Sequence, residues 1–292
     1  MRTDRKDRSG STKSGRRPQP PRRSEPPRRQ PAGPSTPSVE IIAGRNAVRE
    51  ALRAGRRVRR LLYVDEMARD PAVEDAVRMA RESRVPVESA PRDRLDSMAM
   101  EHQGLVAVVA PYPYASWGDV LQVVKTAEHP PTVLLLDTVH DPQNFGTLLR
   151  TADALKVDAV VLPKHRSVQV TPAVVRSSAG AVEHLPVAVV PNLVRAVEEL
   201  KKAGFWIVGL DMDGDRNYWD LDMSGPSALV LGGEDHGIGR LLKEKCDFLV
   251  RLPMSGHVNS LNAAVAGSVV LYEMARQRIT RAVTLEARPV AE

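Results

Sequence analysis

Near-continuous apolar runs alternate with helix-like segments through the second half of the chain. The runs that read as strands are 131–139, 158–163, 185–190, 206–211, 228–233 and 248–252. The segments between them that read as helices include 146–155, 172–180 and 193–204. Apolar runs of this kind are typical of strands that are buried on both faces. Residues 131–280 are therefore predicted to form an α/β domain, with a parallel sheet covered by helices on both faces.

A smaller α/β unit is predicted for residues 39–111. Its expected helices are 44–55, 71–83 and 92–99, and its expected strands are 59–65, 85–90 and 104–111. Gly55 is placed to end the first helix. Residues 112–130 read as a linker that leads into a helix, and residues 281–292 as a C-terminal tail.

Positive charge is concentrated in residues 1–38. This segment has 11 Lys/Arg, 3 Asp/Glu and 8 Pro, and it lacks Ile, Leu, Val and aromatic residues. Since the whole chain carries +6, residues 39–292 carry about −2. The segment is predicted to be disordered because it cannot bury apolar surface. It is either an arm that binds RNA phosphates or a solubilising extension.

A second group of arginines lies where the first helix of the small unit meets its first predicted strand. Five cations so close together repel one another unless an anion compensates, so they indicate either an RNA-binding face or a solvated one. The five are Arg53, Arg56, Arg57, Arg59 and Arg60.

Composition narrows the class of protein further. A single cysteine, Cys246, excludes an internal disulfide, and no Cys/His cluster has the spacing of a zinc site, so we expect no metal. No apolar run reaches the roughly 18 residues that a membrane span requires. The N-terminus lacks the apolar core of a secretory signal, which favours a cytoplasmic protein without a membrane partner.

Three polar stretches follow predicted strands, where parallel sheets usually bind their ligands. They are 140–152, 232–239 and 252–262. In the first, Asn144 and Arg150 are either polar site residues or a helix cap and a surface arginine. In the second, the glycines allow a ligand to approach the backbone closely, although the stretch is not a Walker loop.

The third stretch leads into a long helix. Ser260 is expected to cap this helix. Gly267 indicates that another backbone passes close by, because glycine inside a helix costs roughly 1 kcal/mol relative to alanine. The apolar residues expected to form one face are Leu261, Val265, Leu271, Tyr272 and Ala275.

Taken together, the three stretches contain N-x-G-x-x-x-R-T-A, L-G-G-E-x-x-G and L-P-M-x-G-x-x-x-S-L-N-A-A-V-A, in this order. They resemble the three motifs of the SpoU family of RNA ribose 2′-O-methyltransferases, which have the SPOUT fold. The resemblance covers about 131–278. Residues 39–111, with GRNAVREAL and HQGLVAVV, are similar to the substrate-binding domain that precedes the catalytic domain in many members. That architecture most resembles the subgroup that methylates a guanosine of 23S ribosomal RNA.

The resemblance implies a C-terminal trefoil knot, a homodimer and S-adenosylmethionine as cofactor. The residues that match cofactor contacts are Gly232, Leu252, Met254, Gly256 and Leu261. The residues that match the polar active-site positions are Asn144, Arg150, Glu234, Ser260 and Asn262.

The expected reaction is methyl transfer to a ribose hydroxyl, which is a weak nucleophile that must lose its proton. We expect Arg150 to hold the target phosphate, because a guanidinium keeps its proton in proteins. Glu234 is expected either to hold Arg150 or to accept the proton. Two alternatives stay open: a transfer-RNA 2′-O-methyltransferase, and an RNA-binding SPOUT protein that has lost its activity.

Overall fold

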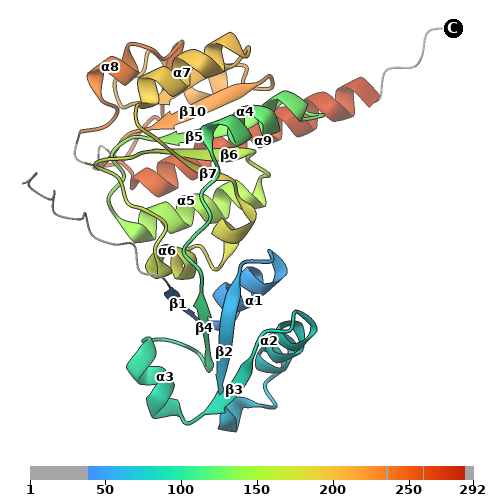
Figure 1. Ribbon diagram of the computed structural model, residues 1–292. Coiled ribbons are helices and arrows are strands. Elements are labelled where there is room, and N and C mark those ends of the chain that lie inside the picture. The colour runs from blue at the N-terminus through green and yellow to red at the C-terminus, as the bar shows by residue number, and fades with distance from the viewer. Residues whose placement is uncertain (1–38, 235, 259, 287–292) are drawn as a thin grey trace, which may run out of the picture. The chain divides into compact units, whose positions relative to one another are not determined.

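The computed structural model describes residues 39–234, 236–258 and 260–286, which form two β-sheets with their helices (Figure 1). The disorder predicted for residues 1–38 falls outside the described residues, as does the last part of the expected C-terminal tail, from residue 287.

The first sheet has four strands in the order β1–β4–β2–β3. Strand β4 is antiparallel to β1 and β2, and β3 is parallel to β2. Gly55 follows the first helix with φ +71°, as expected of a residue that ends a helix. The predicted elements are confirmed to within two residues, and β1 had not been predicted. The elements are β1 (Glu40–Ala43), α1 (Arg45–Arg53), β2 (Val58–Val64), η1 (Asp65–Met67), α2 (Pro71–Glu82), β3 (Val87–Ala90), α3 (Arg92–Met98) and β4 (Leu105–Val109).

The second sheet has seven strands in the order β7–β6–β5–β10–β8–β11–β9. Every pairing in it is parallel, which confirms the predicted sheet type. The two-residue strand β9 had not been predicted. The strands are β5 (Thr132–Leu136), β6 (Ala159–Pro163), β7 (Val187–Val190), β8 (Trp206–Leu210), β9 (Arg216–Asn217), β10 (Ser227–Leu231) and β11 (Phe248–Arg251).

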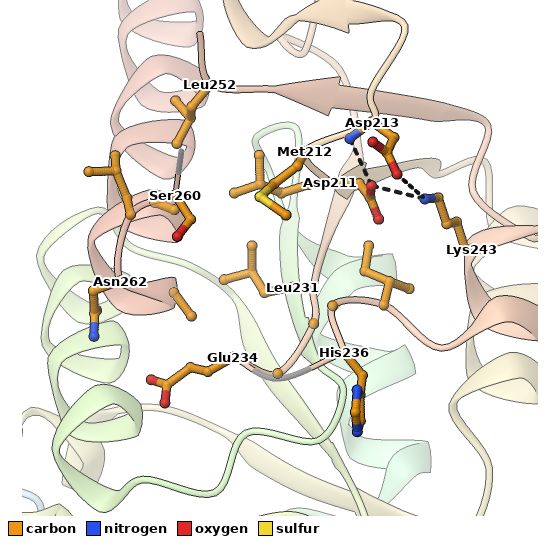
Figure 2. Close-up of a pocket in the computed structure, with 18 of the residues that line it drawn as sticks. Asp211, Met212, Asp213, Leu231, Glu234, His236, Lys243, Leu252, Ser260 and Asn262 are labelled. Atoms are coloured by element: carbon orange, nitrogen blue, oxygen red, sulfur yellow. Dashed lines mark hydrogen bonds and ion pairs between the residues drawn. The ribbon is translucent and has the colours of Figure 1, made fainter. Parts of the chain in front are cut away.

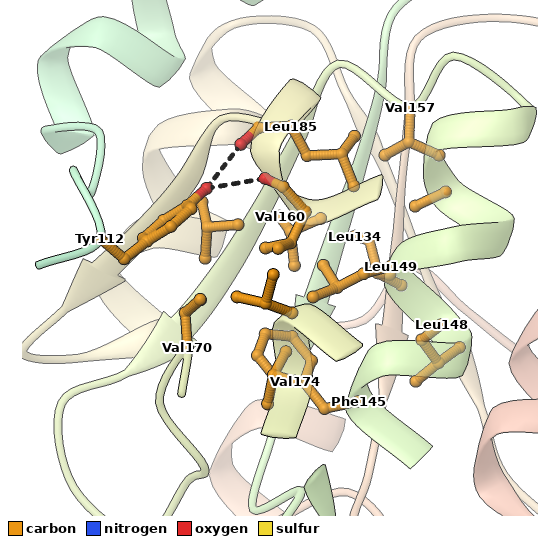
Figure 3. Close-up of a cluster of buried hydrophobic side chains, with 14 of the residues drawn as sticks. Tyr112, Leu134, Phe145, Leu148, Leu149, Val157, Val160, Val170, Val174 and Leu185 are labelled. Atoms are coloured by element: carbon orange, nitrogen blue, oxygen red, sulfur yellow. Dashed lines mark hydrogen bonds between the residues drawn. The ribbon is translucent and has the colours of Figure 1, made fainter. Parts of the chain in front are cut away.

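Helices cover both faces of this sheet. Successive strand residues point to opposite sides, so a strand that is apolar throughout has apolar side chains to bury on each face. Leu134 and Leu136 of β5 belong to the core that includes α5, α6 and α9, whereas Val133 and Leu135 belong to the core that includes α4, α7 and α8. Figure 3 shows the first core, in which Leu134 faces Leu149 of α5. The remaining elements are α4 (Trp117–Thr126), α5 (Pro142–Ala154), α6 (Pro172–Ser177), η2 (Ala181–His184), α7 (Leu193–Lys202), η3 (Tyr218–Asp220), α8 (Arg240–Lys243) and α9 (Ala263–Glu286).

Three helices differ from their predicted limits by more than two residues. Helix α6 ends at Ser177, three residues early, because Ala179 and Gly180 have φ angles of +54° and +88°, which a right-handed helix does not allow. Helix α5 begins at Pro142, four residues early, because the Asp141 side chain accepts a hydrogen bond from Gln143 N at 3.0 Å and Pro142 suits the first turn. Helix α9 continues to Glu286, past the expected domain end at residue 280. Within the described ranges, no helix is long and apolar enough to span a bilayer.

Arg56, one of the five clustered arginines, is a buried structural residue. Its side chain is 1% exposed and donates to Glu183 and to Glu40, each at 2.6 Å. Nearby, the Tyr112 hydroxyl contacts two carbonyl oxygens of the segment around η2, those of Val182 at 3.0 Å and Leu185 at 2.9 Å. For Arg56, both the RNA-facing and the solvated interpretations are therefore wrong, because two carboxylates of this chain balance its charge.

Candidate active site

A cavity of about 660 Å³ opens where strands β8, β10 and β11 end (Figure 2). Its volume is within the range of small-molecule sites, and its wall combines leucines with several polar side chains. The residues that line it are 210–213, 231–234, 236–238, Lys243, Leu252, Met254, 260–263 and Ala266.

Four of the five residues matched to cofactor contacts line this cavity. Gly232 follows β10, Leu252 and Met254 follow β11, and Leu261 precedes α9. Gly256 is exposed and is not among the lining residues. The structure thus brings together the two later polar stretches at one cavity.

The glycines after β10 serve the fold of the loop itself. A side chain at Gly232 would collide with the backbone of Gly237, and one at Gly233 with the backbone of Thr138. The loop closes on itself through a hydrogen bond from Gly237 N to Gly233 O at 3.0 Å. At these two positions, the close approach of the chain's own backbone requires glycine, and both glycines also line the cavity.

Three side chains from the three polar stretches form a hydrogen-bonded chain beside the cavity. Asn262 Nδ2 donates to Asn144 Oδ1 at 2.8 Å, and Asn144 Nδ2 donates to Glu234 Oε1. Asn262 Oδ1 accepts from Ala264 N at 2.9 Å and Val265 N at 3.2 Å. Helix α9 begins at Ala263, the residue after Asn262. Asn262 is therefore the cap of α9, and the prediction that Ser260 caps it is wrong.

The direction of every hydrogen bond in this chain follows from the helix end. Backbone N–H groups only donate, so the Asn262 cap must present its oxygen to α9 and its NH₂ group to Asn144. Asn144 must then present its oxygen to Asn262 and its NH₂ group to Glu234. A carboxylate accepts such a bond, so the start of α9 fixes both amides and holds Glu234 in place.

The other two predicted polar residues lie apart from this chain. Ser260 lines the cavity and is exposed. Arg150 is exposed on α5, six residues and roughly 9 Å along the helix from Asn144. Glu234 binds Asn144, and the described residues include no ion-pair partner for Arg150. The expectation that Glu234 could hold Arg150 is not met in this structure.

The structure adds residues to the site that the sequence analysis did not single out. Asp211 and Met212 follow β8 and line the cavity, and Lys243 of α8 binds Asp211 with an Nζ–Oδ1 distance of 2.9 Å (Figure 2). Asp211 directly follows a central parallel strand. The rule that ligands bind beyond strand ends could have identified it.

The lining suits a molecule with an apolar ring and charged ends. Leu231, Leu252 and Leu261 offer apolar surface for an adenine ring and a thioether chain. Asp211 and Lys243 offer opposite charges that suit the amino and carboxylate groups of an amino acid. The residues present therefore fit S-adenosylmethionine.

Comparison with known protein families gives two matches that together cover both sheets. A model described as the SpoU rRNA methylase family matches residues 131–272. A second, described as RNA 2′-O ribose methyltransferase substrate binding, matches residues 41–115.

Individual relatives agree with these models. A protein of Staphylococcus haemolyticus described as a TrmH family tRNA/rRNA methyltransferase is 43% identical over 239 residues, which are 82% of this chain and 96% of the relative. The crystal structure of the SpoU methyltransferase AviRb from Streptomyces viridochromogenes, in complex with AdoMet, is 30% identical, with a TM-score of 0.70 over 83% of this chain and 92% of AviRb.

An rRNA methyltransferase from Sinorhizobium meliloti with AdoMet bound is 26% identical, with a TM-score of 0.67 over 82% of this chain and 87% of that chain. The two family models and the relative of 43% identity point to the same family. The chain belongs to the SpoU/TrmH family of RNA methyltransferases.

Proposed function

We propose that this protein methylates the 2′-hydroxyl of a ribose, that of a guanosine in 23S ribosomal RNA, with S-adenosylmethionine as the methyl donor. The observation that carries the proposal is the hydrogen-bonded chain Asn262–Asn144–Glu234, which joins the three polar stretches beside one cavity. The substrate-binding match over residues 41–115 and the AdoMet bound by AviRb support it.

The cavity residues have distinct tasks in this proposal. When bound, S-adenosylmethionine supplies a methyl group that its sulfonium already activates. Leu231, Leu252 and Leu261 would hold its apolar part, and Asp211 and Lys243 its charged end. Two tasks remain for side chains of this protein: to position the ribose and to take the proton of its hydroxyl.

Glu234 is the group best placed to take that proton. One of its oxygens accepts from Asn144, which leaves the other free to accept the hydroxyl proton. Asn144 and Asn262 hold the carboxylate still, and positioning of this kind supplies a large part of an enzyme's acceleration. Arg150 would hold the phosphate of the target nucleotide, because its fork matches phosphate oxygens.

A second candidate substrate is transfer RNA, since the Staphylococcus relatives are described as tRNA/rRNA methyltransferases. Mapping ribose methylation in RNA from cells with and without this protein decides between the two. Loss of one 2′-O-methylguanosine from 23S ribosomal RNA supports the proposal, and loss from a transfer RNA supports the second candidate. A protein that has lost its activity would leave both RNAs unchanged, and calorimetry would show whether it still binds S-adenosylmethionine.

We further propose that the active protein is a homodimer that buries one side of α9. Val265, Tyr272 and Ile279 repeat every seven residues and are 47%, 58% and 66% exposed. The sequence analysis expected Val265 and Tyr272 on one face with Leu271, but Leu271 is buried, so the structure divides the expected face. This stripe of three exposed apolar side chains in line on one helix supports an interface there.

A groove of about 610 Å³ beside this stripe extends the proposed interface to α5. Thr147 of α5 lines the groove together with Val265 and Tyr272. Thr147 and Arg150 are three residues apart on the exposed side of α5, so a second copy docked here would lie next to Arg150. Analytical ultracentrifugation at micromolar concentration tests the proposal: a fully active 32 kDa monomer refutes it.

The chain from β11 into α9 is proposed to form a trefoil knot. Strand β11 lies between β8 and β9, so the connection 211–215 must cross it. Gly214 lies against the backbone of Val250 and Arg251, which supports a close crossing. An experimental structure, traced from residue 131 to 286, tests for the knot, and an open trace contradicts it.

A further inference from the structure

Lys164 and Arg166 are two exposed cations on the loop that follows β6. Neither side chain has a hydrogen-bond or ion-pair partner among the described residues. Many other cations in the described part of the chain are paired with a carboxylate, as Arg45 is with Asp70 at 2.8 Å. Since residues 39–292 carry a net charge of about −2, two unpaired cations on one short loop are a distinct local feature.

Three hydrogen bonds donated by backbone N–H groups hold this loop. Lys164 N donates to Val190 O at 2.9 Å, Val168 N to Val139 O at 2.8 Å, and Val170 N to the Tyr114 hydroxyl at 2.7 Å. Arg166 itself has φ +60°, a left-handed conformation that costs a residue with a side chain on the order of 1 kcal/mol. Hydrogen bonds therefore hold the loop at its start, at Lys164, and again just after Arg166, at Val168 and Val170.

The loop lies at the same sheet edge as the candidate active site. Strands β5 and β6 are parallel neighbours, so their carboxyl ends meet at one edge. Val139, which accepts the Val168 bond, lies in the connection from β5 to α5, and α5 carries Asn144. The strand order β6–β5–β10 places Lys164 and Arg166 on the side of β5 opposite the cavity after β10.

We infer that Lys164 and Arg166 bind phosphates of RNA nucleotides that flank the target ribose. This inference rests on the proposed function, which places the reacting ribose near Asn144 and Glu234. If the target nucleotide of an RNA lies near Asn144 and Glu234, a neighbouring nucleotide of that RNA would lie over the end of β6. Arginine binds phosphate through its planar fork, and lysine as a point charge. The two side chains thus act as positioning residues outside the cofactor cavity.

The double variant Lys164→Gln with Arg166→Gln tests this inference, with total RNA from cells that lack the protein as the probe. We expect the KM for RNA to rise about tenfold or more, because two phosphate contacts are lost, and kcat to fall much less than KM rises. The plot of log affinity against log salt concentration should flatten by roughly one to two units, since each phosphate contact contributes about 0.7–0.9. Unchanged affinity for S-adenosylmethionine, measured by calorimetry, reports that the variant is folded.

Lys156→Gln is the matched control. Lys156 is also exposed, has a positive φ of +53° as Arg166 does, and its side chain has no hydrogen-bond or ion-pair partner in the described part of the chain. It precedes β6, however, and so lies at the opposite edge of the sheet. We expect its KM and salt dependence to match those of the unchanged protein.

The outcomes separate this inference from the proposed function. If the unchanged protein methylates ribose and the double variant keeps the same KM and salt dependence, the inference is overturned and the proposed function stands. If the unchanged protein does not methylate ribose, the proposed function fails. RNA binding measured by filter retention then still tests the loop, and equal salt dependence of the double variant and the unchanged protein overturns its role.

Discussion

Asn262 donates a hydrogen bond to Asn144 across 2.8 Å, although 118 positions separate the two residues in the sequence. The bond joins the start of α9 to the first turn of α5. Because α9 dictates which way the Asn262 amide faces, it also dictates which way Asn144 faces, and so which group Asn144 offers to Glu234. The cap of α9 is in this way part of the candidate active site.

Asn262→Asp should separate capping from orientation. A carboxylate still accepts from Ala264 N and Val265 N, so we expect the free energy of unfolding to change by less than about 1 kcal/mol. It cannot donate to Asn144, whose amide would turn and present its oxygen to Glu234. Methyl transfer should then fall on the order of a hundredfold, as measured by single-turnover rates.

Asn192→Asp is the control for that variant. Asn192 caps α7 in the same manner, accepting from Val194 N at 2.9 Å and Arg195 N at 3.3 Å, and it does not line the cavity. In the Asn192→Asp variant, neither the free energy of unfolding nor the rate of methyl transfer should change appreciably. If Asn262→Asp were as active as Asn192→Asp, the orientation of Asn144 would have no role in the reaction.

Arg150→Ala should separate RNA positioning from cofactor binding. Arg150 does not line the cavity, so the affinity for S-adenosylmethionine should stay within about threefold, while methyl transfer falls on the order of a hundredfold or more. Calorimetry and single-turnover rates measure the two effects. A large loss of cofactor affinity would show that Arg150 serves the cavity.

Arg150→Lys distinguishes a phosphate clamp from a proton acceptor. Lysine keeps the positive charge and loses the fork, so a clamp predicts partial activity with the pH profile of the unchanged protein. Lysine also has a lower pKa than arginine, so a proton acceptor at this position predicts a steep rise in rate as the amine deprotonates. Single-turnover rates from about pH 7 to 10 decide between the two.

Arg56→Ala should destabilise the protein strongly. The change leaves the carboxylates of Glu183 and Glu40 without their ion-pair partner, although their side chains are only 2% and 14% exposed. Removing one partner of a buried ion pair typically lowers the free energy of unfolding by about 3–5 kcal/mol. Urea unfolding at pH 7 measures the loss. Arg78→Ala, which breaks solvent-exposed pairs with Asp75 and Glu82, is the control and should have little effect.

The loss in Arg56→Ala should shrink as the pH falls toward 5. Burial raises the pKa of Glu183 above its ordinary value of 4.5, against the opposing influence of Arg56, and without Arg56 it should rise further. A raised carboxyl pKa favours folding below the unfolded pKa, and this contribution is lost as the pH rises through the folded pKa. A deficit that grows toward pH 5 would contradict the assigned charge balance.

Deleting residues 1–38 should weaken RNA binding and flatten its salt dependence. The segment contributes a net charge of +8 and no core-forming residue, so it can attract phosphate without taking part in the reaction. The turnover rate at saturating RNA should stay unchanged. A large fall in that rate would show that the segment serves catalysis directly.

The sequence predicted best the elements whose apolar pattern determines them. Strands β5 and β10 are apolar on both sides because both faces of the sheet are covered, and their runs are unambiguous. Strand β9 exists only because Arg216 and Asn217 pair with β11. No local pattern in two polar residues can reveal such a strand.

The candidate site, like the fold, was predictable only in part. The three stretches around Asn144, Glu234 and Asn262 could be identified from their polar residues after strands, but their hydrogen bonds could not, because these depend on where α9 begins. Ser260 and Asn262 both suit a helix cap, and the structure distinguishes them because Asn262 Oδ1 accepts from Ala264 N and Val265 N. The side chains of Leu231 and Leu148, not a neighbouring backbone, occupy the space that a side chain at Gly267 would need.

The most direct test of the account is methyl transfer by the purified protein to RNA from cells that lack it, with S-adenosylmethionine carrying a labelled methyl group. Nuclease digestion and mass spectrometry then identify the labelled nucleoside. The account predicts label in a single 2′-O-methylated nucleoside, and its loss when Asn144→Ala breaks the hydrogen-bonded chain between Asn262 and Glu234. Label on a base, or equal labelling by Asn144→Ala, would contradict it.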